Sequence, residues 1–424
     1  MATPEQVFGE WDAYAQRKIL KPRDLNLADI ASASALKVVA ITGVRRCGKT
    51  SVLLLLRQRM AKEGKRAAYV SMEDSRVKGI PDVFDAVLKW FGDEGFLLLD
   101  EVTSATGWEG WLARNHEMLQ GKLKLITSSS RRGLSIPAKP LRGRMFSYEL
   151  FPLSFSEFLE FKGMQIEDTT AGRGRAEKAL AEYIEFGGFP EVVLFQDPLE
   201  KIRLLGTYFK DILGLDIADI TKASVSTVEL FGKYALEAPY FSASKCLNFF
   251  KSLGHKIGKQ RILNMERCSQ DGYLFFFVPI YSAKVKDRAQ YPRKAYAGDT
   301  GFMRAVGGRL NWGRLYENAV FLELRRRAHG GEEITYWKNA GGAEVDFVVR
   351  RGLEAATLIQ VVYDLTDGAR DRELRGLAAC ARETGLRSGL IITKDYEGRE
   401  RVGGVGVRFV PLWKWLIAGK KGPG

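Results

Sequence analysis

The first third of the chain alternates short apolar runs with longer stretches of helical character. Apolar residues fill most of 36–42, 95–99 and 123–126, and residues 52–60 read VLLLLRQRM, which favours a helix. Strands that are apolar on both faces are typical of a parallel sheet covered by helices. The pattern therefore predicts an α/β core at this end of the chain.

Residues 155–220 favour helices. The segments FSEFLEFKG, GRAEKALAEYIEFGG and PLEKIRLLGTYFKDILGLDI succeed one another there. The pair Gly187-Gly188, followed by Pro190, is expected to end the second helix. We expect these helices to form a lid over the core, although ordinary core helices would give the same pattern.

Residues 225–300 predict three short helices and two strands. Ser242 is suited to cap the second helix, the third covers about 259–269, and YLFFFVPIY and RKAYAGD have strand character. Three helices and a β-hairpin make a winged helix, a helix-turn-helix variant that binds DNA or docks a protein. In the DNA interpretation, the recognition helix and its entry carry Lys256, Lys259, Gln260, Arg261, Asn264 and Arg267. Lys284, Lys286 and Arg288 would then lie in the loop of the wing.

Composition narrows the class of protein. The 424 residues include 65 Lys+Arg and 51 Asp+Glu, a net charge of +14, and 46% are hydrophobic. This composition is typical of a globular protein of about three domains. Four scattered cysteines without a C-x-x-C pair argue against a disulfide framework or a zinc site, and no apolar run is long enough to span a membrane. We expect a soluble, cytoplasmic protein with no membrane partner.

The positive charge is concentrated in one part of the chain. Residues 241–327 contain 17 Lys+Arg and 6 Asp+Glu, a net charge of +11. A surplus of this kind is expected on a surface that contacts the phosphates of nucleic acid. A solvated surface that only keeps the protein soluble would show it as well.

A phosphate-binding loop follows the first apolar run. The loop has the pattern G-x-x-x-x-G-K-[ST], with a strand before it and a helix after it. Backbone N–H groups of such a loop curl around phosphates, Lys49 can reach the β- and γ-phosphates of ATP, and Thr50 can hold Mg²⁺. The expected nucleotide-binding residues are Gly43, Val44, Arg45, Arg46, Cys47, Gly48, Lys49, Thr50 and Ser51.

Two further polar segments follow apolar runs. Asp100 and Glu101 end the run at 95–99, where Asp100 would complete the Mg²⁺ site and Glu101 would polarise the attacking water. The hydroxyls of 127–130 stand where a γ-phosphate sensor would lie, although a serine-rich turn is an equal interpretation. An arginine in the segment 141–144 could reach the γ-phosphate of a neighbouring subunit, although a lone arginine is usually only a surface residue.

The ordered series of motifs resembles a known family. The phosphate loop, the Asp-Glu pair, TSSS at 127–130, LRGR at 141–144, PLSFSEF at 152–158 and GGFPE at 187–191 are similar to those of prokaryotic AAA-type ATPases that carry a C-terminal domain of unknown function. The resemblance covers about 35–395. It implies a five-stranded ASCE-type core with a helical lid, Ser129 as the sensor and Arg144 as the arginine finger.

The C-terminal part resembles a restriction-endonuclease fold. Glu317 lies in an apolar-periodic helix, Asp346 begins a strand, and Gln360 lies in a second strand about 14 residues later. Enzymes of that fold hold Mg²⁺ with an Asp and a Glu or Gln, and a lysine two residues after the latter activates water. That position is Val362 here, so we expect a degenerate nuclease site with weak or no activity.

The sequence therefore predicts five regions. They are an N-terminal lead segment at 1–35, an AAA-type ATPase core at 36–154, a helical lid at 155–224, a winged helix at 225–305 and a restriction-endonuclease-like domain at 306–424. The leading hypothesis is an ATP-hydrolysing, DNA-interacting motor or switch that uses Mg²⁺. The alternatives are a STAND-like signalling or protein-remodelling switch that does not bind DNA, and an ATP-coupled, Mg²⁺-dependent nuclease. A homo-oligomer or a protein partner is compatible with all three.

Overall fold

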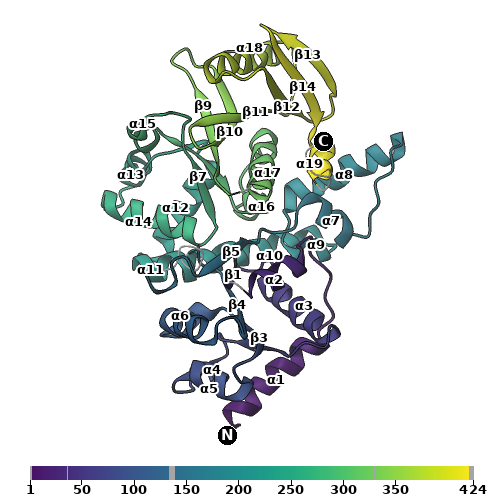
Figure 1. The fold of residues 1–424 in the computed structure, drawn as a ribbon. Helices are drawn as coiled ribbons and strands as arrows, with labels where there is room; N and C mark the ends of the chain where they lie inside the picture. Colours follow the sequence, from purple (N-terminus) through teal and green to yellow (C-terminus); the bar gives the residue numbers. More distant parts are fainter. Residues whose placement is uncertain (1, 36, 133–138, 329, 420–424) are drawn as a thin grey trace. The chain divides into compact units, whose positions relative to one another are not determined.

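A computed structural model describes residues 2–35, 37–132, 139–328 and 330–419 (Figure 1). The chain divides into two compact units. Unit 1 comprises Met1–Phe151 with Asp271–Tyr273, and unit 2 comprises Pro152–Gln270 with Leu274–Gly424. Within the described part of the chain, no helix is long and apolar enough to cross a membrane.

Unit 1 is built on a five-stranded sheet in the order β2-β3-β4-β1-β5, and each neighbouring pair is parallel. Its helices and strands are α1 (Pro4–Arg17), α2 (Leu27–Ala33), β1 (Val38–Thr42), α3 (Lys49–Lys62), β2 (Ala67–Ser71), α4 (Ser75–Lys78), α5 (Val83–Phe91), β3 (Gly95–Asp100), η1 (Val102–Ser104), α6 (Trp108–Leu119), β4 (Leu123–Ser129), η3 (Lys139–Leu141) and β5 (Met145–Glu149). The predicted α/β core with a parallel sheet is confirmed.

Burial explains why these segments form central strands. Every residue of β1, β2 and β3 is buried. Alternate residues face a cluster formed with α5 and α6, which includes Phe84 stacked on Trp111. Figure 1 places α5 and α6 on one face of the sheet and α3 on the other, and α1 packs on the edge strand β2 between α3 and α5. All five strands point the same way, so their carboxyl ends share one edge, where the phosphate loop begins after Thr42.

The N-terminal lead segment contains part of this unit. Helix α1 begins with a capping box between Thr3 and Gln6 and packs against α3 and β2. Asp12 accepts two hydrogen bonds of 2.7 Å from the guanidinium of Arg57, and it also accepts the backbone N–H of Tyr69. Arg57 is buried, so Asp12 supplies the counter-charge that keeps α3 against the sheet.

Unit 2 contains a helical region, a small sheet and a large mixed sheet. Its elements are α7 (Phe155–Phe161), α8 (Thr170–Phe186), α9 (Pro190–Leu194), α10 (Pro198–Asp211), the π-helix η4 (Ile212–Ala218), α11 (Asp219–Thr221), α12 (Val225–Glu237), β6 (Tyr240–Phe241), α13 (Ala243–Ser252), α14 (Lys259–Asp271), β7 (Phe275–Val278), α15 (Val285–Gln290), β8 (Arg293–Ala297), α16 (Gly301–Ala305), α17 (Trp312–Arg327), β9 (Glu332–Lys338), β10 (Glu344–Arg351), β11 (Glu354–Val362), α18 (Asp367–Thr384), β12 (Ser388–Thr393), β13 (Gly398–Val402), β14 (Val405–Pro411) and α19 (Leu412–Ala418).

The Gly187-Gly188 stop lies against a buried carboxylate. Asp299 accepts the N–H of Gly188 at 2.8 Å and that of Gly301 at 2.9 Å. A Cβ on Gly187 would lie 1.6 Å from an oxygen of Asp299, so only glycine allows this approach. The contact fixes the end of α8 next to the start of α16.

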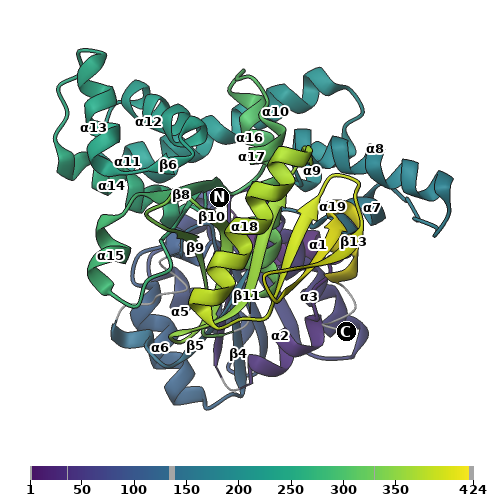
Figure 2. The same ribbon diagram turned by 90° about the horizontal axis from the view of Figure 1, so that it is seen from above.

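Helices α12, α13 and α14 lie together with α15 on one side of unit 2 in both ribbon views (Figures 1 and 2). Ser242 caps α13 by accepting the N–H of Lys245, as predicted. The antiparallel strands β7 and β8 pair as expected, and β6 adds a third strand beside β8. The predicted wing loop is different: Lys284 is the N-cap of α15, and Lys286 and Arg288 lie within this helix. Ser282 and Asp287 hydrogen bond across its first turn and stabilise it.

The large sheet has the order β13-β14-β12-β11-β10-β9. Strands β9, β10 and β11 are antiparallel neighbours, whereas β12 is parallel to β11 and is reached through α18. Helix α18 packs on β10 and β11, and α17 also contacts β11. Together with the helix before it, this mixed sheet has the succession helix, three strands, helix, strand that the C-terminal pattern predicts.

Candidate functional site

The phosphate loop is held in a shape that requires its glycines. A Cβ on Gly43 would lie 2.0 Å from the carbonyl oxygen of Leu150, and Gly48 has a left-handed backbone with φ of 105°. Val44 and Cys47 are buried, and burial raises the pKa of the Cys47 thiol. The Arg23 guanidinium donates to the carbonyl of Cys47 at 2.6 Å, so the lead segment also supports the loop.

The loop leads directly into the N-terminus of α3. Gly48 is the N-cap and offers no side-chain cap to the helix. The first-turn N–H groups of a helix have no intrahelical acceptor, and the helix dipole favours a negative charge beside them. This N-terminus, which includes Lys49, Thr50 and Ser51, therefore suits the phosphates of a nucleotide.

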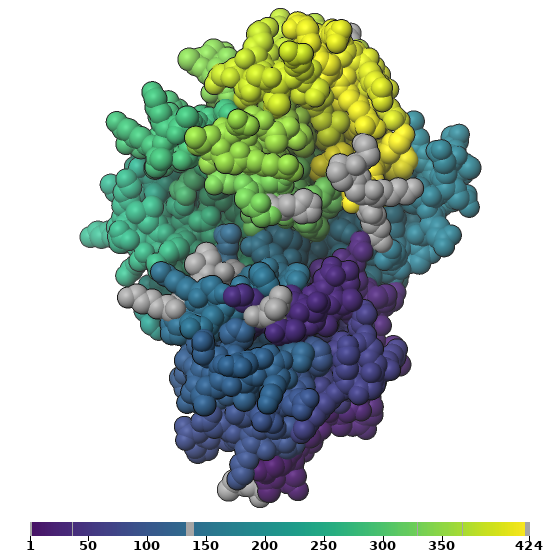
Figure 3. Space-filling model, viewed as in Figure 1, coloured from purple at the N-terminus to yellow at the C-terminus, as the bar shows by residue number. Residues whose placement is uncertain are grey.

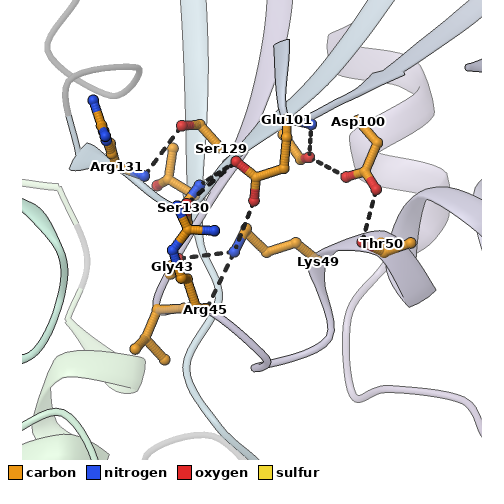
Figure 4. Close-up of polar contacts among 12 residues, drawn as sticks. Gly43, Arg45, Lys49, Thr50, Asp100, Glu101, Ser129, Ser130 and Arg131 are labelled. Atoms are coloured by element: carbon orange, nitrogen blue, oxygen red, sulfur yellow. Dashed lines mark hydrogen bonds and ion pairs between the residues drawn. The ribbon is translucent and has the colours of Figure 1, made fainter. Parts of the chain in front are cut away.

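Lys49 is buried and points back along the loop (Figure 4). Its Nζ donates to the carbonyls of Gly43 at 3.1 Å and Val44 at 3.2 Å, and it lies 3.4 Å from Oε1 of Glu101. Burial alone would lower the pKa of Lys49, but the nearby carboxylates outweigh burial and raise it. The lysine thus carries a positive charge at the point where the loop closes.

Thr50 and Asp100 form the pair expected at a Mg²⁺ site. The Thr50 hydroxyl donates to Oδ2 of Asp100 at 2.7 Å, and the Tyr69 hydroxyl donates to the same oxygen at 2.9 Å. Burial raises the pKa of Asp100. A hydroxyl and a carboxylate at the edge of a phosphate loop are hard oxygen donors, so these two residues fit Mg²⁺ chemically.

Glu101 lies beside Lys49 with a left-handed backbone, φ of 47°. A non-glycine residue in this region is uncommon, and such strain concentrates at functional sites. Oε2 of Glu101 accepts the backbone N–H of Ser130 at 2.9 Å. Burial would raise the pKa of Glu101, but the charge of Lys49 and this hydrogen bond hold it below its usual value. The side chain is therefore an ionised carboxylate.

The serines after β4 divide between two sets of contacts. Ser128 donates to Asp100 and accepts the backbone N–H of Glu101 at 2.9 Å. Ser129, the predicted sensor, instead contacts the Thr103 hydroxyl at 3.0 Å and accepts the N–H of Arg131. Sequence reasoning included Ser128 among the hydroxyls of 127–130 but missed its contacts with Asp100 and Glu101. The parallel register that pairs Leu99 with Thr127 also places Asp100 beside Ser128.

Arg144 lies away from the phosphate loop of its own chain. It precedes β5, and its backbone carbonyl accepts the N–H of Val38 at the start of β1. Its side chain pairs with Glu117 at 3.0 Å. Since β1 and β5 are parallel and five residues long, Arg144 lies about 16 Å from the carboxyl edge of the sheet. An arginine finger acts on the γ-phosphate of a neighbouring subunit, so that role of Arg144 stays a prediction. By contrast, Arg45 pairs with Glu73 and Arg132 with Glu149 at the carboxyl edge of the sheet. Glu149 is the last residue of β5, and the other three follow the ends of their strands.

The predicted DNA-binding residues gather on α14 and its entry in unit 2. All except the half-buried Asn264 are exposed, and Gln260 donates to Asn264 at 3.2 Å. Lys245 and Lys251 on α13 and Lys284 and Lys286 near α15 are also exposed. Glu266, the only acidic residue of 242–270, is buried against Arg293. Figure 3 shows the segment 240–290, in teal and green, at the surface of unit 2.

Part of the charge surplus of 241–327 is internal, however. Lys294 is buried among carboxylates, the half-buried Arg326 donates to the carbonyl of Pro152, and Arg314 donates to the carbonyl of Ala238. Arg327 pairs with Glu323 at 2.8 Å. The net charge of +11 therefore overstates the charge that faces solvent.

The nuclease-like residues converge within unit 2. Asp346 Oδ2 accepts the N–H of Val361 at 2.9 Å, and Gln360 Oε1 accepts the N–H of Asp346 at 2.9 Å. Glu317 and Asp346 both contact the ammonium of Lys294, which sequence reasoning missed. No pattern in the sequence pairs Lys294 with residues more than 20 positions away.

The fold and the nucleotide site together define a P-loop ATPase fold of the AAA class. A family model described as an AAA domain matches residues 35–159, and a model described as a domain of unknown function, DUF4143, matches residues 312–415. The uncharacterized protein MJ1544 of Methanocaldococcus jannaschii is 32% identical over 400 residues, which are 90% of this chain and 88% of that protein. The chain therefore belongs to the family of prokaryotic proteins in which an AAA domain precedes a DUF4143 domain.

Other similarities are more distant. An uncharacterized protein of Haemophilus influenzae is 25% identical over 393 residues, 89% of this chain and 94% of that protein. Among solved structures, AMPPCP-bound DnaA from Aquifex aeolicus is 16% identical, with a TM-score of 0.27 over 58% of this chain and 86% of that chain. A STAND protein from Pyrococcus horikoshii with a tetratricopeptide repeat sensor is 12% identical, with a TM-score of 0.29. The match covers 74% of this chain and 47% of that chain. Likenesses of this size carry no functional argument.

Proposed function

We propose that this protein hydrolyses ATP and acts as a DNA-interacting switch or motor. The observation that carries the ATPase half is the cluster of Lys49, Thr50, Asp100 and Glu101 at the carboxyl edge of the parallel sheet. It combines a phosphate-binding lysine, a hydroxyl–carboxylate pair for Mg²⁺ and a second carboxylate that can orient water. Bound Mg²⁺ would neutralise charge on the phosphates.

In this proposal, Lys49 changes partners when ATP binds. In the structure, its ammonium lies 3.4 Å from Glu101 and donates to the loop carbonyls. Phosphate oxygens are stronger acceptors for Lys49 than those carbonyls. Once Lys49 turns to the phosphates, Glu101 keeps the N–H of Ser130 and can accept a proton from water. The ionised state of Glu101 supports this role as a base.

A covalent route links the nucleotide site to the basic helix. Helix α14 ends at Asp271, and the segment Asp271–Tyr273 belongs to unit 1. There the Tyr273 hydroxyl donates to Oγ1 of Thr42 at 2.8 Å, and Thr42 is the residue before Gly43. A conformational change in the phosphate loop would therefore be transmitted through Thr42 and Tyr273 to the end of α14. This connection supports the role of a switch.

The DNA half of the proposal rests on the exposed surface of α13, α14 and α15. The succession α12, β6, α13, α14, β7, β8 is that of a winged helix, although α15 replaces the usual wing loop. Arg261 and Arg267 are exposed, and Glu266, the acidic residue between them, is buried. Phosphate contacts require exposed cations of this kind.

A protein-docking role is the second candidate, because the same surface carries apolar residues. Leu253 is 52% exposed, Leu263 39% and Val285 71%. Apolar side chains amid cations favour a protein partner as much as a phosphate backbone. This role corresponds to a signalling or remodelling switch that does not bind DNA.

Two experiments test the proposal. ATP binding should be lost in Lys49→Ala and kept in Lys62→Ala, the matched control at the other end of α3. Unchanged ATP affinity in Lys49→Ala would contradict the nucleotide site.

Duplex DNA binding, measured by filter binding, should weaken steeply between 50 and about 200 mM salt. Binding that is independent of salt, or no binding together with capture of a protein partner, would favour the docking role.

A further inference from the structure

A lysine lies at the centre of three carboxylates in the nuclease-like region of unit 2. Nζ of Lys294, on β8, lies 2.8 Å from Oε1 of Glu317, 2.8 Å from Oε1 of Glu344 and 2.6 Å from Oδ1 of Asp346. The Lys294 side chain is only 6% exposed. An ammonium has three N–H donors, and this one has a carboxylate for each.

The position of the ammonium is the point where the acidic residues of α17 and β10 converge. A divalent cation held by the same oxygens would have to lie beside the ammonium. In buried surroundings, the repulsion between the two charges would oppose its binding. Lys294 and Mg²⁺ therefore compete for one place.

The remaining groups of the predicted nuclease site do not fit a metal ion either. Gln360 uses its Oε1 on the N–H of Asp346 and donates from Nε2 to Glu373 at 2.7 Å. Val362 stands where the water-activating lysine is expected. Among the residues that the structure describes, no three His, Cys, Asp or Glu side chains have the arrangement of a metal site.

Neighbouring groups balance the charge of the cluster. The Tyr296 hydroxyl donates to Glu317 at 2.5 Å, and Lys338 lies 3.1 Å from Glu344. Burial by itself would lower the pKa of Lys294, but Asp346 and Glu317 raise it well above its usual value. Burial also raises the pKa of Asp346, and Lys294 opposes that rise. Lys294 is thus charged throughout the physiological pH range.

We propose that Lys294 is a built-in counter-ion that takes the metal position of the nuclease-like cluster. It turns the cluster into an electrostatic joint that ties β8 to α17 and β10. Strand β8 belongs to the small sheet beside the basic helices, so the joint connects that module to the C-terminal domain within unit 2. The acidic residues are then retained to hold the lysine, and no cutting activity is needed to explain them.

The joint makes a specific prediction for Lys294→Ala. Truncation leaves three converging carboxylates without their counter-ion, which should be strongly destabilising. A cavity of about 100 Å³ already lies beside the cluster, lined by Lys294, Glu317, Glu344 and Asp346. The variant should therefore bind Mn²⁺, which prefers carboxylate and water ligands. Removing Lys294 should turn an internal ion pair into a cation site.

The test compares Mn²⁺ binding by calorimetry and thermal melting, without nucleotide, in the wild type, Lys294→Ala and the control Lys286→Ala. Lys286 is an exposed lysine of α15 outside the joint. We expect Lys294→Ala to bind about one Mn²⁺ per chain more than the wild type, because its carboxylates are the added ligands. Its melting temperature should be lower without Mn²⁺ and rise when Mn²⁺ is added. The wild type and Lys286→Ala should show neither effect.

A second variant covers the case in which Lys294→Ala does not fold. Lys294→Met combined with Glu344→Gln and Asp346→Asn removes the lysine and two of the charges it balances, and it should fold without Mn²⁺. The proposal would be overturned if Lys294→Ala stayed unfolded with Mn²⁺ and the triple variant did not fold either. So would Mn²⁺ binding by the wild type that Asp346→Asn removes, or Mg²⁺-dependent DNA cleavage lost in Lys294→Ala. None of these measurements depends on ATP hydrolysis or on DNA binding by α14.

Discussion

At the scale of single residues, the nucleotide site depends on bridging hydroxyls as much as on its charged groups. Asp100 accepts from Thr50, Tyr69 and Ser128, so three elements fix the direction of its carboxylate. Ser128 also accepts the N–H of Glu101, whose backbone is strained. One hydroxyl thus orients both acidic residues of the site.

Ser128→Ala should therefore impair ATP hydrolysis more than Ser129→Ala. Loss of the Ser128 hydroxyl leaves the N–H of Glu101 and an oxygen of buried Asp100 each short of a partner, which costs about 1–3 kcal/mol. Ser129 bonds only to Thr103 and Arg131 in this set of contacts, so it is the matched control. Turnover and melting temperature of both variants check the prediction. A larger loss of turnover in Ser129→Ala would instead support the sensor role that the family resemblance implies.

Asp299 should make the stability of unit 2 depend on pH. Burial raises its pKa to about 7, while the N–H groups of Gly188 and Gly301 act in the opposite direction. Between its ordinary pKa of 3.8 and about 7, the folded state binds a proton that the unfolded state releases. This contribution to stability is therefore present at low pH and lost as the pH rises towards 7.

Asp299→Asn should remove that slope. Urea midpoints of the wild type and the variant, measured from pH 4.5 to 7, should converge as the pH rises, because only the wild type loses its proton. The asparagine amide also faces an N–H group, so the variant should be less stable than the wild type at the acidic end. A constant difference across this range would show that Asp299 does not titrate there.

At the scale of elements, α1 is part of the ATPase unit and not a mere leader. Sequence patterns missed it because its buried apolar residues, among them Val7 and Phe8, are few, and because its ion pair of Asp12 with Arg57 leaves no local pattern. That pair joins residues 45 positions apart. The phosphate loop and the Asp-Glu strand were predictable, because local spacing specifies them.

Asp12→Ala should destabilise unit 1 by about 3 kcal/mol, because it leaves the buried guanidinium of Arg57 without a counter-charge. Glu10→Ala is the matched control on the same helix. Glu10 pairs with Arg76, but both side chains are at least half exposed, so its loss should have little effect. Chemical denaturation measures both; equal effects would mean that α1 is not docked through Asp12.

The same distinction between local and distant contacts holds in unit 2. The three helices and the hairpin strands were predictable from periodicity, and Ser242 from cap chemistry. Helix α15 was not predictable, because hydrogen bonds of Ser282 with Asp287 and Arg288 stabilise a helix where an extended wing was expected. The position of Lys294 among three carboxylates depends on tertiary packing alone.

Helix α14 should determine DNA affinity. Arg261→Ala and Arg267→Ala should each weaken duplex binding and reduce the slope of log affinity against log salt by about 1 if each contacts a phosphate. Lys78→Ala, an exposed lysine of α4 in unit 1, is the control and should change neither. Unchanged slopes in both arginine variants would exclude phosphate contacts by this helix and favour the docking role.

At the scale of the whole molecule, the net charge of +14 includes cations with three different surroundings. Lys49 lies beside Glu101, where the proposed phosphate site needs no overall charge. Lys294 is buried and Arg326 half-buried, and both pair with the protein's own carboxylates. The exposed cations of α13, α14 and α15 remain for a partner. Charge counted along the sequence located the region, but only packing separates the internal cations from the exposed ones.

The central claim is that this AAA-type protein hydrolyses ATP at the Lys49–Glu101 site. The most direct measurement is the steady-state rate of ATP hydrolysis by the wild type, by Glu101→Gln and by the control Glu63→Gln, with ATP binding measured in parallel. Glu63 is the C-cap of α3 and pairs with Arg59 at the surface. We predict turnover in the wild type and the control, and a rate roughly 10²–10⁴-fold lower in Glu101→Gln with ATP binding kept, because a general base contributes about that much. Wild-type turnover in Glu101→Gln would contradict the account.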